Sequence, residues 1–124
     1  MRTTRLKCRA DFLRAQQGIR RRSTGLVLEV CPTPPAKTVQ KAGVGFRAGF
    51  TASKKVGNSV ARSRAKRRLR ALAAEILAKD GLTGTDYVLI ARPQTLDRPF
   101  ALLRQDLTEA LAQAHRKLLQ SQEK

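Results

Sequence analysis

Residues 50–70 read FTASKKVGNSVARSRAKRRLR. Two lysines follow the end of an apolar strand, Gly57 permits a turn, and Asn58 or Ser59 can cap a helix that we expect to run from about Ser59 to Ala78. The apolar stripe of this helix comprises Leu69, Leu72, Ala73 and Ile76. The segment therefore predicts a strand, a turn and a helix that has one core face and one basic face.

Elements on both sides complete a single α+β domain over residues 1–124. The expected strands are 19–22, 26–31, 44–53 and 86–91, and the expected helices are 10–17, 59–78 and one that opens at Pro99. Apolar residues alternate along 44–53, which predicts a core face and a polar face. Three prolines place 32–43 in a loop. The order α-β-β-β-α-β-α predicts a four-stranded sheet with helices packed on it and a β-α-β crossover.

The distribution of charge indicates the partner. The chain has 26 basic and 9 acidic residues, which gives a formal net charge of +17. No acidic residue occurs from Val30 to Ala74, where eleven residues are basic. Such a region repels itself unless a polyanion neutralises it. Only 4% of the residues are aromatic, so phosphate contacts must dominate over base stacking. We therefore expect an RNA-binding protein.

The helix after residue 58 presents most of this charge. Five basic residues point away from its apolar stripe or flank it and can reach an RNA backbone: Arg64, Lys66, Arg67, Arg68 and Arg70. Arg62 lies almost in phase with the stripe, so we expect it over the end of the sheet beside Lys54 and Lys55. Like charges at this density would destabilise a helix that faces only water. The pattern thus favours contact with nucleic acid.

The inventory argues against other classes of protein. Cys8 and Cys31 lie far apart, and His115 is the one histidine, so no metal site is expected. Nine scattered acidic residues, none of them in the basic region, supply no catalytic set for an autonomous nuclease. No apolar run approaches the roughly 18 residues that span a bilayer, and a membrane-surface protein would need interfacial aromatic residues. We expect a cytoplasmic protein with free thiols and no membrane contact.

The central segment resembles the protein component of bacterial ribonuclease P. The likeness rests on Ser53-Lys54-Lys55, the Gly57-Asn58 turn and the run Arg62-Ser63-Arg64-Ala65-Lys66-Arg67. It extends to Arg5-Leu6-Lys7 with Ala10-Asp11-Phe12, which look like the N-terminal helix of that family, and to Tyr87–Arg92, which look like its last strand. The usual family motif has Arg-Asn-Arg where this chain has Ser63, which lacks the amide group.

The resemblance implies a protein subunit that assists a ribozyme. In that family the catalytic RNA uses Mg²⁺ to remove the 5′ leader of precursor tRNA, and the protein itself binds no cofactor and needs no obligatory protein partner. The residues implied to bind the catalytic RNA are Asn58, Arg62, Arg64, Lys66, Arg67, Arg68 and Arg70. A cleft between the first helix and the sheet, with Phe12, Lys54, Lys55 and Arg92, is implied to hold the leader. Phe12 suits either an RNA contact or the core, and the crossover is implied to be left-handed.

A ribosomal or other structural RNA-binding protein fits the composition equally well. Only the segment from Ser53 to Arg70, together with the last strand and Arg92, separates the two readings. The number of protein copies in a particle, the leader bases that are read and the role of residues 32–43 stay open at this point.

Overall fold

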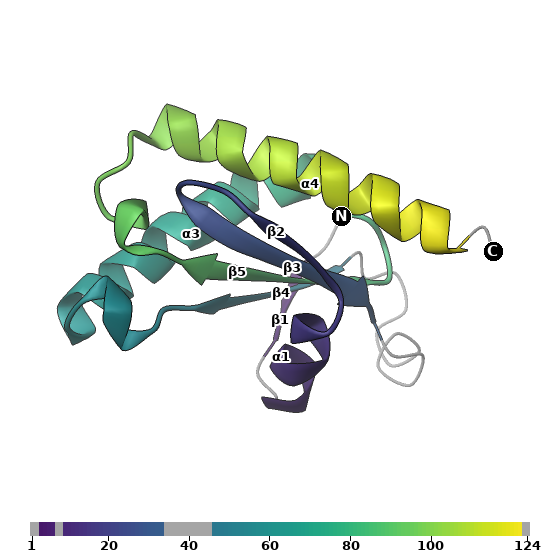
Figure 1. Ribbon diagram of the computed structural model, residues 1–124, viewed down its shortest axis with the longest axis horizontal. Helices are drawn as coiled ribbons and strands as arrows, with labels where there is room; N and C mark the ends of the chain where they lie inside the picture. The colour runs from purple at the N-terminus through teal and green to yellow at the C-terminus, as the bar shows by residue number, and fades with distance from the viewer. Residues whose placement is uncertain (1–2, 7–8, 34–45, 123–124) are drawn as a thin grey trace.

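The computed structural model describes residues 3–6, 9–33 and 46–122, which form a mixed sheet with helices on both faces (Figure 1). The strands are β1 (Thr3–Arg5), β2 (Ile19–Arg22), β3 (Leu26–Pro32), β4 (Phe46–Thr51) and β5 (Thr85–Ala91). The helices are α1 (Arg9–Gln16), α3 (Ser59–Asp80) and α4 (Phe100–Gln122), with 3-10 turns η1 (Lys54–Val56) and η2 (Pro93–Thr95). The predicted α+β fold is confirmed.

The sheet has the order β1-β4-β5-β3-β2. β4 and β5 are parallel, and α3 joins them, as expected for a β-α-β unit. β3 runs antiparallel to both β5 and β2. All four predicted strands are present, and the short strand β1 adds a fifth at one edge, parallel to β4. The left-handed crossover stays an expectation from the resemblance. Because β4 and β5 are parallel, their carboxyl ends lie side by side at the same end of the strands.

The main core lies between the sheet and the pair α3 and α4. Every residue of the predicted α3 stripe is buried, and in α4 the predicted stripe is buried as well: Leu103, Leu107, Ala110, Leu111, Ala114 and Leu118. On β4, Phe46 and Ala48 face this core, as the alternation predicted. Residues 34–45 lie outside the described part of the chain, so the expectations for Val44, Gly45 and most of the 32–43 loop fall there.

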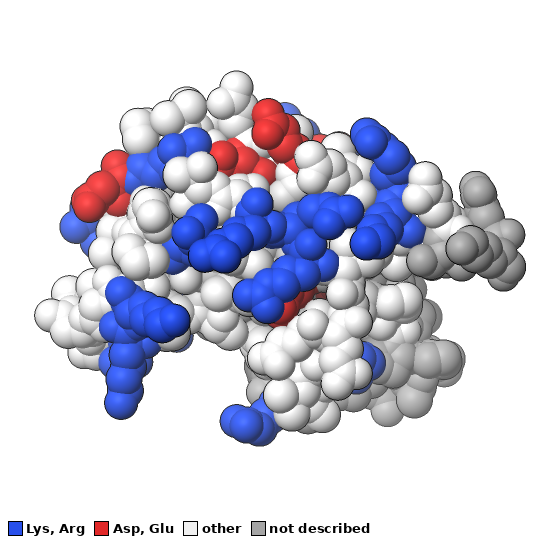
Figure 2. Space-filling view, in the orientation of Figure 1, with Lys and Arg blue, Asp and Glu red and all other residues white. Residues whose placement is uncertain are grey.

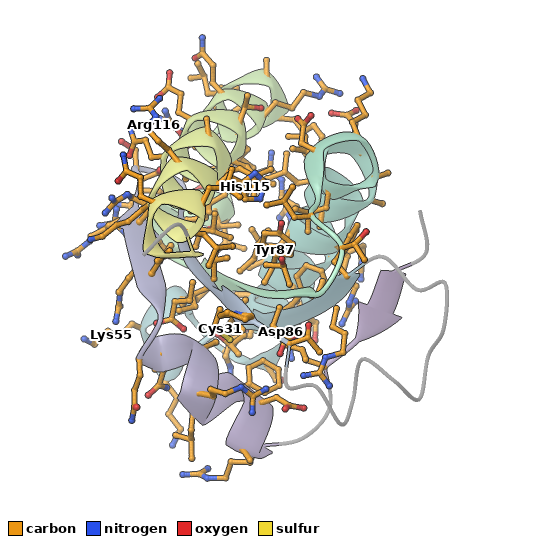
Figure 3. All side chains as sticks on the ribbon, turned by 90° about the vertical axis from the view of Figure 1, so that its right-hand side faces the viewer. Cys31, Lys55, Asp86, Tyr87, His115 and Arg116 are labelled. Carbon is orange, nitrogen blue, oxygen red and sulfur yellow. The ribbon has the colours of Figure 1, made fainter. Side chains whose placement is uncertain are left out.

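Tyr87 joins the main core to α4 through its hydroxyl group. The hydroxyl accepts a hydrogen bond from the Leu82 amide at 2.8 Å and lies 2.6 Å from Nε2 of His115. Burial raises the pKa of Tyr87 to about 12, so the hydroxyl group stays protonated. Burial also lowers the pKa of His115, which favours its neutral imidazole form. Figure 3 shows this pair between the two long helices.

A smaller cluster packs α1 on the opposite face. It contains Leu6, Ala15, Cys31 and Val88, with Phe12 and Ile90 partly buried against it. A Cβ atom at Gly49 would lie 2.7 Å from the Phe12 ring, so the absence of a side chain at Gly49 makes room for that ring. The face of β4 that was expected to be simply polar is therefore covered here by α1. Phe12 packs on the sheet, and part of its surface stays exposed.

Candidate nucleic-acid interface

The interface begins where β4 ends. The Ser53 hydroxyl accepts a hydrogen bond from the Lys55 amide at 3.3 Å and caps η1. The side chains of Lys54 and Lys55 in this turn are both exposed. Gly57 then has φ 145°, a conformation that favours glycine. This turn reverses the chain into α3. The two lysines thus lie just beyond the carboxyl end of β4, immediately before the basic helix.

Asn58 fixes the start of that helix. Its Oδ1 accepts a hydrogen bond from the Ala61 amide at 2.9 Å, so of the two residues predicted as possible caps, Asn58 and Ser59, Asn58 is the N-cap. A cap of this kind typically contributes about 1 kcal/mol to helix stability. The asparagine therefore orients α3 for whatever the helix binds, and its own contact with RNA stays a prediction.

The outer surface of α3 carries exposed cations without acidic neighbours. Arg64, Arg67 and Arg70 are exposed, and Lys66 is half-buried. None of these four has an ion pair among the described residues. The first carboxylate along the helix, Glu75, is already paired with Arg104 of α4 at 2.6 Å. This half of α3 therefore presents cationic groups that an anion can neutralise.

Arg62 is half-buried near the start of α3, in agreement with its position close to the apolar stripe. Its Nε is buried and makes no hydrogen bond to any described residue. A buried donor without an acceptor is unfavourable, because it has lost water and gained no partner. An anionic oxygen at this position would supply the missing acceptor.

The structure gives Arg68 a different place from the one predicted. Its guanidinium donates to the carbonyl oxygens of Thr95 at 2.6 Å, Leu96 at 2.8 Å and Arg98 at 2.7 Å. It also lies 5.8 Å from the centroid of the Phe100 ring. The helical wheel directed Arg68 away from the core, but the turn after β5 packs over that side of α3. Arg68 therefore secures the η2 region.

Arg92 also has a structural partner. Its Nη1 donates to the carbonyl oxygens of Ser23, at 2.5 Å, and Thr24, at 3.3 Å, in the turn between β2 and β3. The parallel register pairs Thr51 with Ile90, which brings the lysines after β4 to the same edge as Arg92. Phe12, in contrast, lies on the α1 face against Gly49. The predicted leader residues thus divide between the edge of the sheet and one of its faces.

A buried ionic cluster, which the sequence did not predict, attaches α1 to the sheet. Asp86 is fully buried and accepts from Arg47 Nη2 at 2.6 Å, Arg14 Nη2 at 3.1 Å and the Thr33 hydroxyl at 2.6 Å. Asp11 of α1 accepts from Arg14 at 2.7 Å and from Arg47 at 3.3 Å. Figure 3 shows Asp86 on the α1 side of the sheet, opposite Tyr87. We call these five residues the α1 clamp.

The clamp raises the pKa of both of its arginines, which therefore stay positively charged. The hydrogen bond to Asp86 raises the pKa of Arg47, and the hydrogen bond to Asp11 raises that of Arg14. Nearby, burial raises the pKa of the Cys31 thiol. In the sequence, the one sign of this cluster is Asp86, an acidic residue near the start of the otherwise largely apolar strand β5. The clamp engages the guanidinium groups of two arginines, of which Arg47 is 12% and Arg14 36% exposed.

Basic side chains gather on a second surface, along β2 and toward α4 (Figure 2). Arg20 and Arg22 of β2 are exposed, as are Arg116 and Lys117 of α4. Arg20 lies 3.5 Å from the buried carboxylate of Glu29, whose pKa burial raises. The sequence predicts a binding surface within the first seventy residues, where a second basic group runs from Arg2 to Arg22 and is interrupted only by Asp11. The arginines of β2 belong to that group.

Two other kinds of site are absent from the described residues. No three of their His, Cys, Asp and Glu side chains lie close enough together to hold a metal ion. None of their helices combines the length and the apolar character needed to cross a membrane. Cys31 is a free, buried thiol. The interface is therefore built from cations, capping groups and backbone.

Comparison with known proteins agrees with this geometry. Residues 1–115 match the profile of the family described as Ribonuclease P. The ribonuclease P protein component of Paramagnetospirillum magneticum is 48% identical over 112 residues, which cover 89% of this chain and 81% of that protein. The protein component of Ruegeria pomeroyi is 47% identical over 111 residues, with 89% and 85% covered.

Solved structures support the same assignment. The ribonuclease P protein of Staphylococcus aureus superposes with a TM-score of 0.65 at 28% identity, and the match covers 89% of this chain and 94% of that one. The family profile, the sequence relatives and the shared fold are mutually consistent. This chain belongs to the ribonuclease P protein component family.

Proposed function

We propose that this chain assists the catalytic RNA of ribonuclease P in the Mg²⁺-dependent removal of the 5′ leader from precursor tRNA. The observation that supports the proposal is the outer surface of α3, where Arg64, Arg67 and Arg70 have no acidic partner among the described residues. Lys66 and the half-buried Arg62 extend this surface. Phosphates of the catalytic RNA would neutralise it, with a gain from counterion release.

The leader contacts follow from the positions at the edge of the sheet. Lys54 and Lys55 project beyond β4, where they can bind the backbone of a single strand. Phe12 keeps an exposed part beside the α1 face and offers one stacking surface. Arg68 and Arg92 would act mainly by holding η2 and the β2–β3 turn in place.

The chemistry is assigned to the RNA because of the side chains that this chain has. His115 is bonded to Tyr87 in the core, so it is not available as a general acid or base. Asp11, Asp86 and Asp106 are all engaged by arginines. The protein would reduce the repulsion between two RNAs and leave hydrolysis, with its Mg²⁺ ions, to the catalytic RNA.

A reconstituted cleavage assay tests the proposal. Precursor tRNA is incubated with the cognate catalytic RNA at physiological Mg²⁺, with no protein, with wild type, with Arg62→Ala/Arg64→Ala or with Arg104→Ala. Arg104 is a matched control because it is an exposed arginine that already has a partner, Glu75. We expect wild type and the control to restore accurate 5′ cleavage, the double variant to fail, and protein alone to cut nothing.

Two results would contradict the proposal. If the protein alone cleaved precursor tRNA, the catalytic groups would lie in the protein. A catalytic RNA that neither binds the protein nor responds to it would favour a structural RNA-binding role for this chain.

A further inference from the structure

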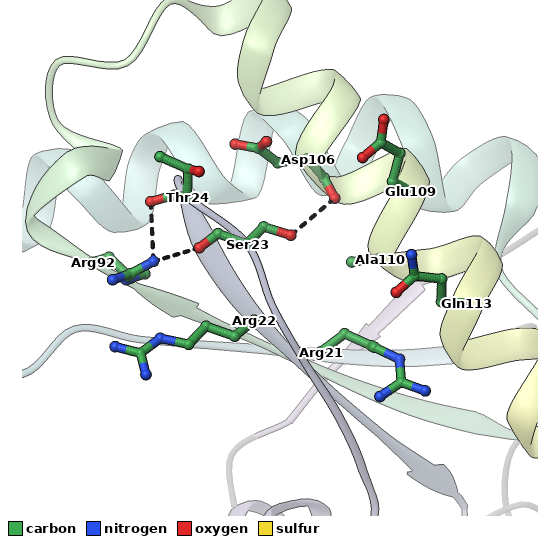
Figure 4. Close-up of a pocket in the computed structure, with 9 residues that line it drawn as sticks. All are labelled: Arg21, Arg22, Ser23, Thr24, Arg92, Asp106, Glu109, Ala110 and Gln113. Atoms are coloured by element: carbon green, nitrogen blue, oxygen red, sulfur yellow. Dashed lines mark hydrogen bonds between the residues drawn. The ribbon is translucent and has the colours of Figure 1, made fainter.

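A polar pocket of about 470 Å³ lies between the β2–β3 turn and α4 (Figure 4). Residues 21–24 form one wall, Arg92 lies at the end of β5, and α4 contributes Asp106, Glu109 and Gln113. The hydrogen bonds from Arg92 to the Ser23 and Thr24 carbonyls hold the turn in place. The walls are therefore set by the fold, and they come from three separate segments of the chain.

The balance of charge in this pocket is positive. Arg21, Arg22 and Arg92 supply three guanidinium groups. Asp106 is already engaged, because it accepts from Arg98 Nε at 2.6 Å and from the Gly25 amide at 3.1 Å. Glu109 is exposed and has no ion pair among the described residues. An anion in the pocket thus meets three cations and one free carboxylate.

One donor in the pocket lacks an acceptor. Arg21 Nε is buried and makes no hydrogen bond to any described residue, although Nη1 of the same side chain donates to the Arg20 carbonyl at 3.2 Å. Figure 4 shows the side chains of Arg21 and Arg22 extending in opposite directions, with Arg21 on the side of Gln113 and Arg22 on the side of Arg92. Two places for an anionic oxygen result, one at each end of the pocket.

The surroundings favour a strand of RNA over a small anion. β2 is an edge strand that carries three arginines, and the basic surface of Figure 2 runs along β2 and toward α4. A chain of phosphates can occupy both ends of the pocket and follow this surface. A pocket of about 470 Å³ can enclose part of a single strand, whereas a double helix could only lie across its mouth.

We propose that this pocket binds consecutive phosphates of a single-stranded RNA segment, with Arg21 and Arg22 as the binding residues and Arg92 as the residue that holds the turn in position. The proposal rests on the proposed function and adds a second RNA contact, separate from the outer surface of α3. The strand can come from the 5′ leader or from the catalytic RNA. The two sources share their phosphodiester chemistry, so the experiment has to distinguish them.

The test measures two affinities of the full-length protein over a range of salt concentrations. One is the dissociation constant for the catalytic RNA alone. The other is the dissociation constant of the complex of protein and catalytic RNA for precursor tRNAs with long or short leaders. The variants are Arg21→Ala, Arg22→Ala and Glu109→Gln, with Arg104→Ala and Glu75→Gln as controls that change the net charge equally. Thermal unfolding verifies that each variant is folded.

We expect Arg21→Ala and Arg22→Ala each to weaken one of the two affinities by about threefold to tenfold, and to reduce its salt slope by about 0.7 per lost contact. Glu109→Gln should strengthen the same affinity by about twofold, because it removes the one free carboxylate of the pocket. A gain of this kind cannot arise from damage to the fold. An effect that grows with leader length identifies the leader, and an effect on catalytic RNA alone identifies that RNA.

Unchanged affinities for all three pocket variants, relative to their controls, would overturn the inference. So would a gain from Glu75→Gln as large as that from Glu109→Gln, because the effect would then be one of net charge only. If wild type itself fails to bind the catalytic RNA, the proposed function fails instead. The two failures are thereby distinguishable.

Discussion

Arginines serve different purposes in the α1 clamp and on the outer surface of α3. In the clamp, Arg14 and Arg47 donate to the carboxylates of Asp11 and Asp86, which are 2% and 0% exposed. On α3, Arg64 and Arg67 are exposed and have no carboxylate partner among the described residues. The basic residues that give the net charge of +17 therefore do not all have the same role. Part of it stabilises the fold, and part is available to a ligand.

The difference predicts which variants lose stability and which lose affinity for RNA. A buried ion pair that loses one partner leaves an uncompensated charge in a medium that solvates it poorly. An exposed arginine that is removed leaves only water, and it relieves repulsion from its neighbours. The two regions should therefore respond to substitution in opposite ways.

Asp86→Ala should give the largest effect. It removes the acceptor of Arg47, Arg14 and Thr33 together, so we expect the free energy of unfolding to fall by about 3–5 kcal/mol. Urea denaturation followed by circular dichroism measures this change. Asp97→Ala is the control, since Asp97 is exposed and should change stability by less than about 0.5 kcal/mol. Equal losses for the two variants would mean that the clamp does not attach α1.

Arg64→Ala/Arg67→Ala should come next, with its effect on affinity. We expect binding to the catalytic RNA to weaken by about tenfold to a hundredfold, and the salt slope to become shallower, because two phosphate contacts are lost. The free energy of unfolding should stay within about 0.5 kcal/mol of wild type. Filter binding at several salt concentrations and urea denaturation provide the two values. A wild-type affinity that does not depend on salt would contradict the electrostatic account as a whole.

Arg68→Ala sharpens the comparison within a single helix. Three carbonyl oxygens lose their donor, so we expect a loss of about 1–3 kcal/mol in the free energy of unfolding. Arg68→Lys should recover only part of this loss, because one ammonium cannot replace the fork of the guanidinium. Thermal and urea unfolding of both variants test the assignment. If Arg68→Ala is as stable as wild type, Arg68 does not secure η2 and belongs with the exposed arginines of α3.

The smallest effect is expected from the core pair of Tyr87 and His115. The folded protein holds His115 with a lowered pKa, so it binds a proton less readily than the unfolded chain, whose value lies near 6.5. The stability from the neutral histidine is present above that value and is lost as pH falls through the lowered, folded pKa. Between pH 7 and pH 5, wild type should therefore lose more stability than His115→Gln, by less than about 1 kcal/mol after solvent screening. If the free energies of unfolding of wild type and His115→Gln change in parallel between pH 7 and pH 5, this prediction is wrong.

The periodicity of the sequence was sufficient for the main elements. Apolar stripes in α3 and α4 and the short apolar strands β3 and β5 are strong local signals, and the structure has them within a few residues of the predicted bounds. β1 was missed because three residues are too few to show a period. The α1 face of β4 was read as polar, because nothing local reveals that Phe12 would fill the space above Gly49.

The candidate site was predictable in composition but not in the availability of each side chain. The helical wheel placed Arg64 and Arg67 on the outside, where the structure has them exposed. It gave Arg68 the same status, because the carbonyl groups that bind Arg68 come from residues 27 to 30 positions further along the chain. Arg92 likewise finds its acceptors 68 and 69 positions earlier. Contacts at that distance depend on tertiary structure.

The most direct test measures the affinity of the catalytic RNA for two variants of adjacent residues, Arg67→Ala and Arg68→Ala, at a temperature where both are folded. The account predicts that Arg67→Ala weakens binding by about threefold to tenfold with unchanged stability. It predicts that Arg68→Ala lowers stability and binds within about twofold of wild type. Equal losses of affinity for the two variants, or no loss for Arg67→Ala, would contradict the division between arginines that hold the fold and arginines that bind RNA.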